Sequence, residues 1–202
     1  MSIPAVSIPA AILVGGLGRR LGGPKAGVPV GGVALLSRVR RAAAAVCDEV
    51  VLVGKAGEPV PDCDLPRIDE SFPDRCALSG VVAALSAFPG RSVLVLACDH
   101  PFLEPALLSR LAGDVEPFDA RLPVVGGRIQ PLVAAYGPGA LDPLGRALAD
   151  GRLALVRALS PLALDLVPEA ALRALDPGLR SFVNVNDPAA LAAAELRADK
   201  KN

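Results

Sequence analysis

The segment from Leu13 to Lys25 constrains the fold most strongly, because an apolar run leads directly into a loop rich in glycine and cationic residues. Residues 10–14 are all apolar and are predicted to form a buried strand. The loop that follows contains five glycines, two arginines and a lysine. Glycines let backbone N–H groups approach phosphate oxygens, and the cations neutralise phosphate charge. The sequence therefore predicts a nucleotide-binding loop at the end of the first strand.

The spacing within this loop does not match two common phosphate-binding motifs. The dinucleotide fingerprint needs a third glycine and an acid closing the second strand. Here Leu21 takes the place of that glycine, and the second predicted strand runs into Gly54. A Walker loop needs Ser or Thr after its lysine, but Ala26 follows Lys25. An ordinary glycine-rich turn is the remaining alternative, and the cations beside the glycines favour a phosphate site over it.

The composition is that of a globular protein with a sizeable apolar core. Its 202 residues suffice for one α/β domain, and 52% of them are apolar. Twenty-one basic residues balance 21 acidic ones, which argues against a nucleic-acid partner. No apolar stretch approaches the roughly 20 residues that span a bilayer, so we expect no membrane association.

The cysteines are more typical of buried thiols than of a metal site. Cys47, Cys63, Cys76 and Cys98 are widely spaced, and His100 is the single histidine. These spacings give poor support for zinc. Unpaired thiols and the lack of a signal-peptide pattern predict a cytoplasmic protein.

Short apolar runs alternate with helical patterns along most of the chain. Runs this apolar are typical of parallel strands covered on both faces. We therefore predict a single domain over residues 1–202, with a Rossmann-like three-layer α/β/α fold and a mixed, mainly parallel sheet that gains a late antiparallel hairpin strand. The expected strands are 10–14, 49–53, 65–68, 92–97 and 162–167, with a hairpin of 120–125 and 131–136. The expected helices are 34–46, 78–88, 105–111, 141–149, 153–159 and 188–197.

Asp99 follows the clearest central strand, residues 92–97. Ligands bind at the carboxyl ends of strands in open α/β sheets. A carboxylate there is suited to hold Mg²⁺ against triphosphate oxygens. The position fits a turn or helix-cap aspartate equally well, since Pro101 follows closely. His100 is interpreted as a packed neighbour of Asp99 rather than a catalytic base.

Two further polar groups are candidates for ligand contacts. Alternation puts the amides of Asn184 and Asn186 on one face, where they suit a polar substrate or a metal shell. A turn before the last helix explains them as well. Asp69 and Glu70 follow the third predicted strand, where a carboxylate would accept hydrogen bonds from guanine. A solvated loop acid is the alternative there.

With these motifs in place, the chain resembles the molybdenum cofactor guanylyltransferase family, within the nucleotide-diphospho-sugar transferase-like nucleotidyltransferases. That family opens with L-A-G-G-x-S-x-R-M-G-x-x-K. In this chain Val14, Gly18 and Leu21 replace its Ala, Ser and Met. Residues 98–101, 131–136 and 184–188 resemble its C-D-x-P, P-L-x-A-x-Y and N-x-N-x-P motifs. The positions matching the opening motif are Leu13, Gly15, Gly16, Arg20, Gly22 and Lys25.

The chain also departs from the family at positions near the base. The family's G-P-L-A-G is Cys-Ala-Leu-Ser-Gly at residues 76–80, and an asparagine that often ends the second strand is replaced near Val53. These changes leave a CTP-using molybdopterin cytidylyltransferase, or another small-molecule nucleotidyltransferase, as an alternative. A non-catalytic relative that binds nucleotide or cofactor is a further alternative, against which the retention of Lys25 and Asp99 weighs.

The resemblance implies a Mg²⁺-dependent enzyme that transfers GMP from GTP to molybdopterin or its molybdenum form. It implies catalytic roles for Lys25, Arg20 and Asp99, with Asp99 holding the metal. Asn184 and Asn186 would face the acceptor or the metal. Other cofactor-biosynthesis proteins or molybdoenzyme apoproteins are plausible partners for so labile a product. The implied nucleotide-binding residues are Leu13, Val14, Gly15, Gly16, Gly18, Arg20, Lys25, Asp69 and Asp99.

Overall fold

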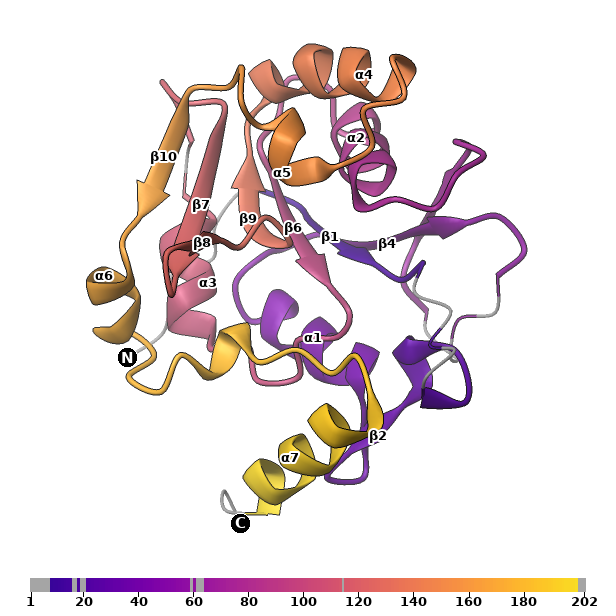
Figure 1. Ribbon diagram of the computed structural model, residues 1–202, viewed down its shortest axis with the longest axis vertical. Coiled ribbons are helices and arrows are strands. Elements are labelled where there is room, and N and C mark those ends of the chain that lie inside the picture. The colour runs from indigo at the N-terminus through magenta and orange to yellow at the C-terminus, as the bar shows by residue number, and fades with distance from the viewer. Residues whose placement is uncertain are drawn as a thin grey trace.

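The computed structural model describes residues 8–199 except 16–17, 19–20, 59, 61–63 and 114 (Figure 1). Its strands are β1 (Ala10–Leu13), β2 (Pro29–Val30), β3 (Val33–Ala34), β4 (Val50–Lys55), β5 (Arg67–Glu70), β6 (Val93–Ala97), β7 (Ala120–Val125), β8 (Arg128–Ile129), β9 (Val133–Tyr136) and β10 (Leu164–Val167). Its α-helices are α1 (Leu35–Ala44), α2 (Ala77–Ala87), α3 (Pro105–Leu111), α4 (Leu141–Ala149), α5 (Leu155–Ala158), α6 (Glu169–Arg173) and α7 (Pro188–Asp199). The 3₁₀ turns within the described residues are η2 (Lys25–Gly27), η3 (Pro138–Ala140) and η4 (Arg180–Phe182).

The main sheet is mixed and mostly parallel, which confirms the predicted fold class. Its strand order is β10-β7-β9-β6-β1-β4-β5. The central strand β1 pairs in parallel with β4 on one side and β6 on the other. Strand β9 runs antiparallel to both of its neighbours, β6 and β7. After β1 the strand order continues to β4 on one side and later to β6 on the other, so the order reverses at β1. In such a sheet, ligands bind in the crevice at the carboxyl ends of the strands where the order reverses, which here is the end of β1.

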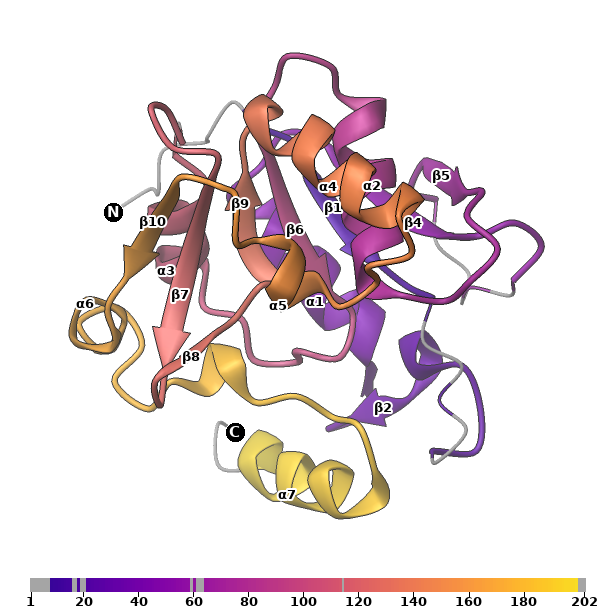
Figure 2. The same cartoon turned by 45° about the horizontal axis from the view of Figure 1, so that its top comes forward.

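Helices cover both faces of this sheet, which explains the unbroken apolar runs of its central strands. Helices α2, α4 and α5 lie on one face, and α1 and α3 on the other (Figures 1 and 2). Along β6, Leu94 and Leu96 pack with α1 and α3, whereas Val93 and Val95 pack with α2 and α4. All four side chains are fully buried.

The late hairpin forms with its first strand, β7, at the predicted residues 120–125, but the returning chain is divided into β8 and β9 instead of one strand over 131–136. The Gly126-Gly127 turn has positive φ at both positions, +56° and +72°, as a tight two-residue hairpin requires. It therefore pairs β7 at once with the two-residue β8. The Gln130 N–H still donates to the Pro123 carbonyl of β7 at 2.9 Å, residues 131–132 then leave the ladder, and β9 pairs with the beginning of β7. This bulge brings Leu132 to the end of β6, where its carbonyl accepts the Ala97 N–H at 2.9 Å.

The C-terminal helix packs on a small hairpin that the sequence analysis did not predict. Strands β2 and β3 pair with each other, and α7 lies beside β2 (Figure 1). Val30, Phe102, Val185 and Ala194 form a separate apolar cluster at this contact. Within the described residues, every helix is too short or too polar to cross a membrane.

Candidate functional site

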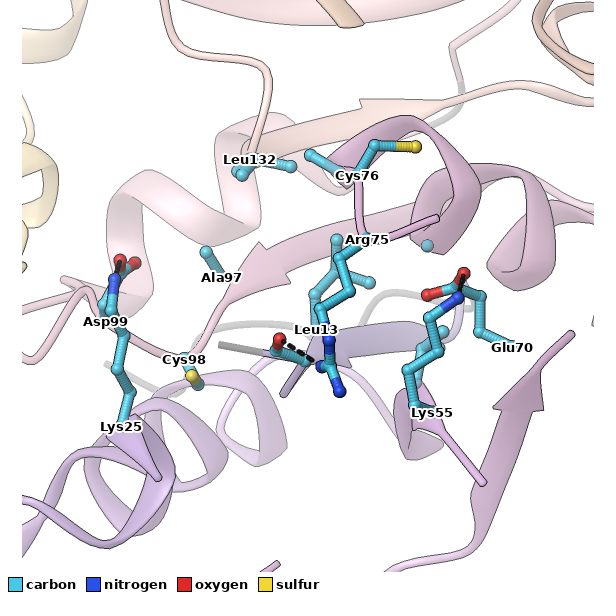
Figure 3. Close-up of a pocket in the computed structure, with 14 residues that line it drawn as sticks. Leu13, Lys25, Lys55, Glu70, Arg75, Cys76, Ala97, Cys98, Asp99 and Leu132 are labelled. Carbon is cyan, nitrogen blue, oxygen red and sulfur yellow. Dashed lines mark hydrogen bonds and ion pairs between the residues drawn. The ribbon is translucent and has the colours of Figure 1, made fainter. Parts of the chain in front are cut away.

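A pocket of about 260 Å³ opens where β1, β4, β5 and β6 end (Figure 3). Parallel strands deliver their carboxyl ends to one edge of a sheet, so residues distant in sequence meet there. Leu13 and Gly15 come from β1 and the loop after it, and Asp99 follows β6. Lys25 also lines this pocket. The glycine-rich segment and the carboxylate after the central strand therefore share one pocket.

Lys25 is the centre of a polar cluster at one end of the pocket. Its Nζ lies 3.0 Å from Asp99 Oδ2 and also donates to Asn186 Oδ1. The side chains of Lys25 and Asp99 are 19% and 15% exposed, so their charges interact in a partly dehydrated environment. Asn186 reaches the cluster because the Val185 N–H donates to the Asp99 carbonyl at 2.9 Å. Asn184, on the other side of buried Val185, is exposed.

The backbone of the loop after β1 depends on glycine at position 18. Gly18 has φ of +55°, and a Cβ there would lie 1.8 Å from the Gly23 carbonyl oxygen. The Gly18 carbonyl accepts the Leu21 N–H at 2.7 Å, so the loop folds back on itself before Lys25. Val14 is buried and donates its N–H to the Val53 carbonyl. Three predicted loop residues, Gly16, Arg19 and Arg20, lie outside the described residues.

His100 and the Ser181 carbonyl form a buried polar network next to Asp99. His100 is 6% exposed, and its Nδ1 lies 3.0 Å from the Ser181 carbonyl oxygen. Its Nε2 lies 3.7 Å from Asp99 Oδ1. Burial lowers the pKa of His100, although Asp99 opposes that shift. This environment agrees with the prediction of a packed histidine. Burial also raises the pKa of the neighbouring Cys98 thiol to about 12, so this thiol is unreactive.

A second charged pair, Lys55 and Glu70, marks the opposite end of the pocket. Strand β4 extends to Lys55, which stands opposite Glu70 in the parallel register with β5. Their side chains are 14% and 8% exposed, and Lys55 Nζ lies 2.6 Å from Glu70 Oε1. Lys55 Nζ also donates to the carbonyls of Phe72 and Asp74, which holds the following loop against the strand.

Asp69 does not line the pocket that holds Lys25 and Asp99. Neighbouring residues of a strand point to opposite faces, so Glu70 points into the pocket and Asp69 points away. Asp69 is 60% exposed and pairs with Arg67 at 3.0 Å. Together with Glu70 it lines a second hollow beside α2 and α4. Sequence reasoning placed the two acids together, and the strand register that brings Glu70 but not Asp69 to the pocket of Lys25 and Asp99 was its missing information.

Arg75 and Cys76 also line the pocket. The sequence analysis assigned no contact to Arg75, whereas Cys76 opens the segment 76–80 that the resemblance puts near the base. Both lie in the loop between β5 and α2, and Cys76 precedes the first residue of α2. Arg75 Nη1 donates to the Gly15 carbonyl at 3.3 Å (Figure 3). Gly80 of α2 lies against Leu13, because a Cβ on Gly80 would stand 3.1 Å from a Leu13 methyl carbon.

The residues at Asp99 fit a metal ion that is held mainly by a substrate. Among the described residues, no group of three or more His, Cys, Asp or Glu side chains converges on a metal position. Mg²⁺ commonly takes one or two protein carboxylates and completes its octahedral shell with substrate phosphates and water. The Asp99 carboxylate, at the end of the pocket that holds Lys25, matches that requirement.

Residues 10–165 match the family model described as a MobA-like NTP transferase domain. This match covers the glycine-rich loop, Asp99 and all of the main sheet except the last two residues of β10. The chain belongs to the MobA-like NTP transferase family.

Members of this family include close relatives with a stated activity. The chain is 32% identical to a molybdenum cofactor guanylyltransferase from Desulfosudis oleivorans, over 91% of this chain and 92% of that protein. It is 35% identical to a probable molybdenum cofactor guanylyltransferase from Chloroflexus aggregans, over 88% of each chain.

Solved structures show the same fold over nearly the whole chain. Molybdopterin-guanine dinucleotide biosynthesis protein A from Archaeoglobus fulgidus superposes with a TM-score of 0.83 and 30% identity, covering 96% of this chain and 100% of that one. A 2-C-methyl-D-erythritol 4-phosphate cytidylyltransferase from Thermus thermophilus superposes with a TM-score of 0.69 at 24% identity, covering 97% and 100%. The second likeness, at low identity, concerns the fold alone.

Proposed function

We propose that this member of the MobA-like family transfers GMP from GTP to the terminal phosphate of molybdopterin or its molybdenum form, releasing pyrophosphate. The observation that carries the proposal is the meeting of Lys25 and Asp99 in the pocket where the β1 loop ends. The guanylyltransferase names of its relatives support the nucleotide and the acceptor.

The proposed step is a displacement at the α-phosphorus of GTP. An oxygen of the acceptor phosphate forms the new P–O bond, and the bond from the α-phosphorus to the bridging oxygen breaks. The bonding electrons leave with pyrophosphate. An ionised phosphate needs no strong general base, so the chemistry depends on positioning and on neutralising charge.

Lys25 and Asp99 have complementary parts in this proposal. The Lys25 ammonium neutralises charge that develops on the oxygens of the α-phosphate. Asn186 and Asp99 hold that ammonium in place, because each accepts a hydrogen bond from it. The Asp99 carboxylate would also hold Mg²⁺, which supplies charge neutralisation of the triphosphate when bound. Arg20 is proposed to assist Lys25.

The other end of the pocket is suited to the base. Backbone groups of residues 13–15 would contact the base and ribose. Glu70 has carboxylate oxygens that accept hydrogen bonds from the N1–H and amino group of guanine. We assign the base-facing acid to Glu70 rather than Asp69, because only Glu70 lines the pocket with Lys25 and Asp99.

The proposal also covers where the reaction takes place and which proteins receive its product. We propose a cytoplasmic location, supported by the free thiols of Cys47, Cys76 and Cys98, since such thiols are typical of reducing compartments. Direct transfer of the product to molybdoenzyme apoproteins or to other cofactor-biosynthesis proteins is proposed from the lability of the cofactor.

The decisive experiment measures pyrophosphate release with molybdopterin as acceptor and GTP, CTP, ATP or UTP as donor, with Mg²⁺ and with EDTA. We expect release with GTP and Mg²⁺ and little with the other donors. A parallel thermal-shift series reports binding alone, because a ligand at 100 times its Kd stabilises the folded state by about 2.7 kcal/mol. Release with CTP in place of GTP would identify a cytidylyltransferase. GTP binding without pyrophosphate release would identify a non-catalytic relative.

A further inference from the structure

Arg75 lies across the middle of the pocket and carries a charge that the proposed chemistry does not use. The view in Figure 3 places its guanidinium between the Lys25–Asp99 pair and the Lys55–Glu70 pair. Its side chain is 43% exposed, so it is free of close packing on part of its surface. A nucleotide with its phosphates at one pair and its base toward the other passes directly by Arg75.

The contacts of Arg75 hold it firmly at one side and weakly at the other. Its Nη2 forms an ion pair with Glu58, whose side chain is 18% exposed. Its Nη1 reaches the Gly15 carbonyl at 3.3 Å, which is long for a hydrogen bond between nitrogen and oxygen. Gly15 belongs to the backbone proposed to contact base and ribose, so a nucleotide competes with Arg75 for this carbonyl.

The loop that carries Arg75 is anchored to the sheet. Lys55 Nζ donates to the carbonyls of Phe72 and Asp74, immediately before Arg75 in the loop. Cys76, the residue after Arg75, caps α2, which begins at Ala77. The backbone of Arg75 is therefore held on both sides, and the side chain is the part that is able to change its partner.

We propose that Arg75 determines base specificity by donating two hydrogen bonds to O6 and N7 of guanine once it releases the Gly15 carbonyl. This inference rests on the proposed function. A guanidinium is a planar fork of donors that matches two adjacent acceptors, and guanine presents O6 and N7 in that arrangement. Adenine presents an amino donor beside N7, so one N–H of the guanidinium would face another donor instead of an acceptor. Glu70, which lines the same pocket, accepts from the adjoining edge of the base, where guanine presents its N1–H and amino group.

The experiment compares GTP and ATP binding by calorimetry for the wild-type chain, Arg75→Lys and Arg75→Gln. Lysine keeps the positive charge but loses the fork, so we expect GTP affinity to fall about ten- to a hundredfold, as for other bidentate base contacts. ATP affinity should change by less than about twofold. Glutamine is the side chain that matches N6 and N7 of adenine, so Arg75→Gln should shift the preference further toward ATP.

Arg152→Lys is the matched control, because Arg152 is 58% exposed and pairs with Asp150 away from the pocket. It should leave both affinities unchanged, and circular dichroism should show that all variants are folded. Equal losses for GTP and ATP in Arg75→Lys would overturn the inference in favour of a phosphate contact. Unchanged affinities in Arg75→Lys would overturn the inference in favour of a purely structural role for Arg75.

The same titrations separate this inference from the function on which it rests. A wild-type chain that binds GTP and ATP equally would overturn the base choice of the proposed function, and the inference with it. A wild-type chain that prefers GTP, with the same preference in Arg75→Lys, would overturn the role of Arg75 alone.

Discussion

The Lys25 ammonium lies 3.0 Å from the Asp99 carboxylate, although 74 positions separate the two residues in the chain. The loop after β1 contributes the cation and the end of β6 contributes the acid. Strands β1 and β6 are parallel neighbours in the sheet, so the loops that follow their carboxyl ends lie next to each other. The pair is the structural basis for the predictions on catalysis.

We expect Lys25→Ala and Asp99→Ala each to lower turnover about a hundredfold or more, because each removes charge stabilisation from the transition state. The double variant should lose much less than the product of the two losses, because residues that act as a unit are not additive. Steady-state pyrophosphate release measures this. Asp150→Asn, at an aspartate that is 61% exposed, is the control. Near-normal turnover of either single variant would remove that residue from the mechanism.

Asn186 should affect turnover more than Asn184, although the two residues share one motif. Only Asn186 is seen to accept a hydrogen bond from Lys25, whereas Asn184 is exposed. A hydrogen bond to a charged group contributes about 1.5–3 kcal/mol, so Asn186→Ala should lower kcat at least about tenfold. Asn184→Ala is the matched comparison, in kcat and in KM for the acceptor. A larger kcat effect from Asn184→Ala would contradict this ranking.

Alanine substitutions at three glycines of the loop should separate backbone strain from steric clash. Gly18→Ala combines a positive φ with a contact at 1.8 Å, whereas Gly22→Ala combines a φ of +79° with open space. Gly23→Ala meets open space, and its φ lies outside the strained range. Urea denaturation should show a loss near 1 kcal/mol for Gly22→Ala. The loss should be larger for Gly18→Ala and smaller for Gly23→Ala, and GTP binding should follow the same order. Equal stability of the three variants would refute the loop geometry.

Lys55→Met should destabilise the protein, because it leaves the Glu70 carboxylate without its partner at a position that is 8% exposed. Breaking a buried pair in this way costs about 3 kcal/mol, to be measured by urea denaturation. The exposed Arg152–Asp150 pair supplies the comparison, and Arg152→Met should change stability by less than about 1 kcal/mol. GTP affinity should fall with Lys55→Met as well, because Lys55 holds the loop that carries Arg75. Similar stability losses in the two variants would contradict a buried role for Lys55.

The central strands and several helices were predictable because burial leaves a local pattern. The run at 92–97 is almost wholly apolar, and the structure buries it on both faces as β6. Helix α3 occupies the predicted residues 105–111. The small hairpin β2–β3 and helix α6 escaped prediction, because two-residue strands and a five-residue helix are too short for a periodic pattern.

For the site, the chain itself determined the chemical types: a glycine-rich cationic loop after the first strand and a carboxylate after the central one. These signals are local, since each depends on which residues follow a strand. Tertiary structure decided which residues face one another. Strand register turned Glu70 into the pocket and Asp69 away from it, and paired Glu70 with Lys55. Packing of the C-terminal segment on Asp99 brought Asn186 to Lys25, and the loop held by Lys55 put Arg75 across the pocket. Contacts of this kind join residues far apart in the chain, and only a complete arrangement of strands specifies them.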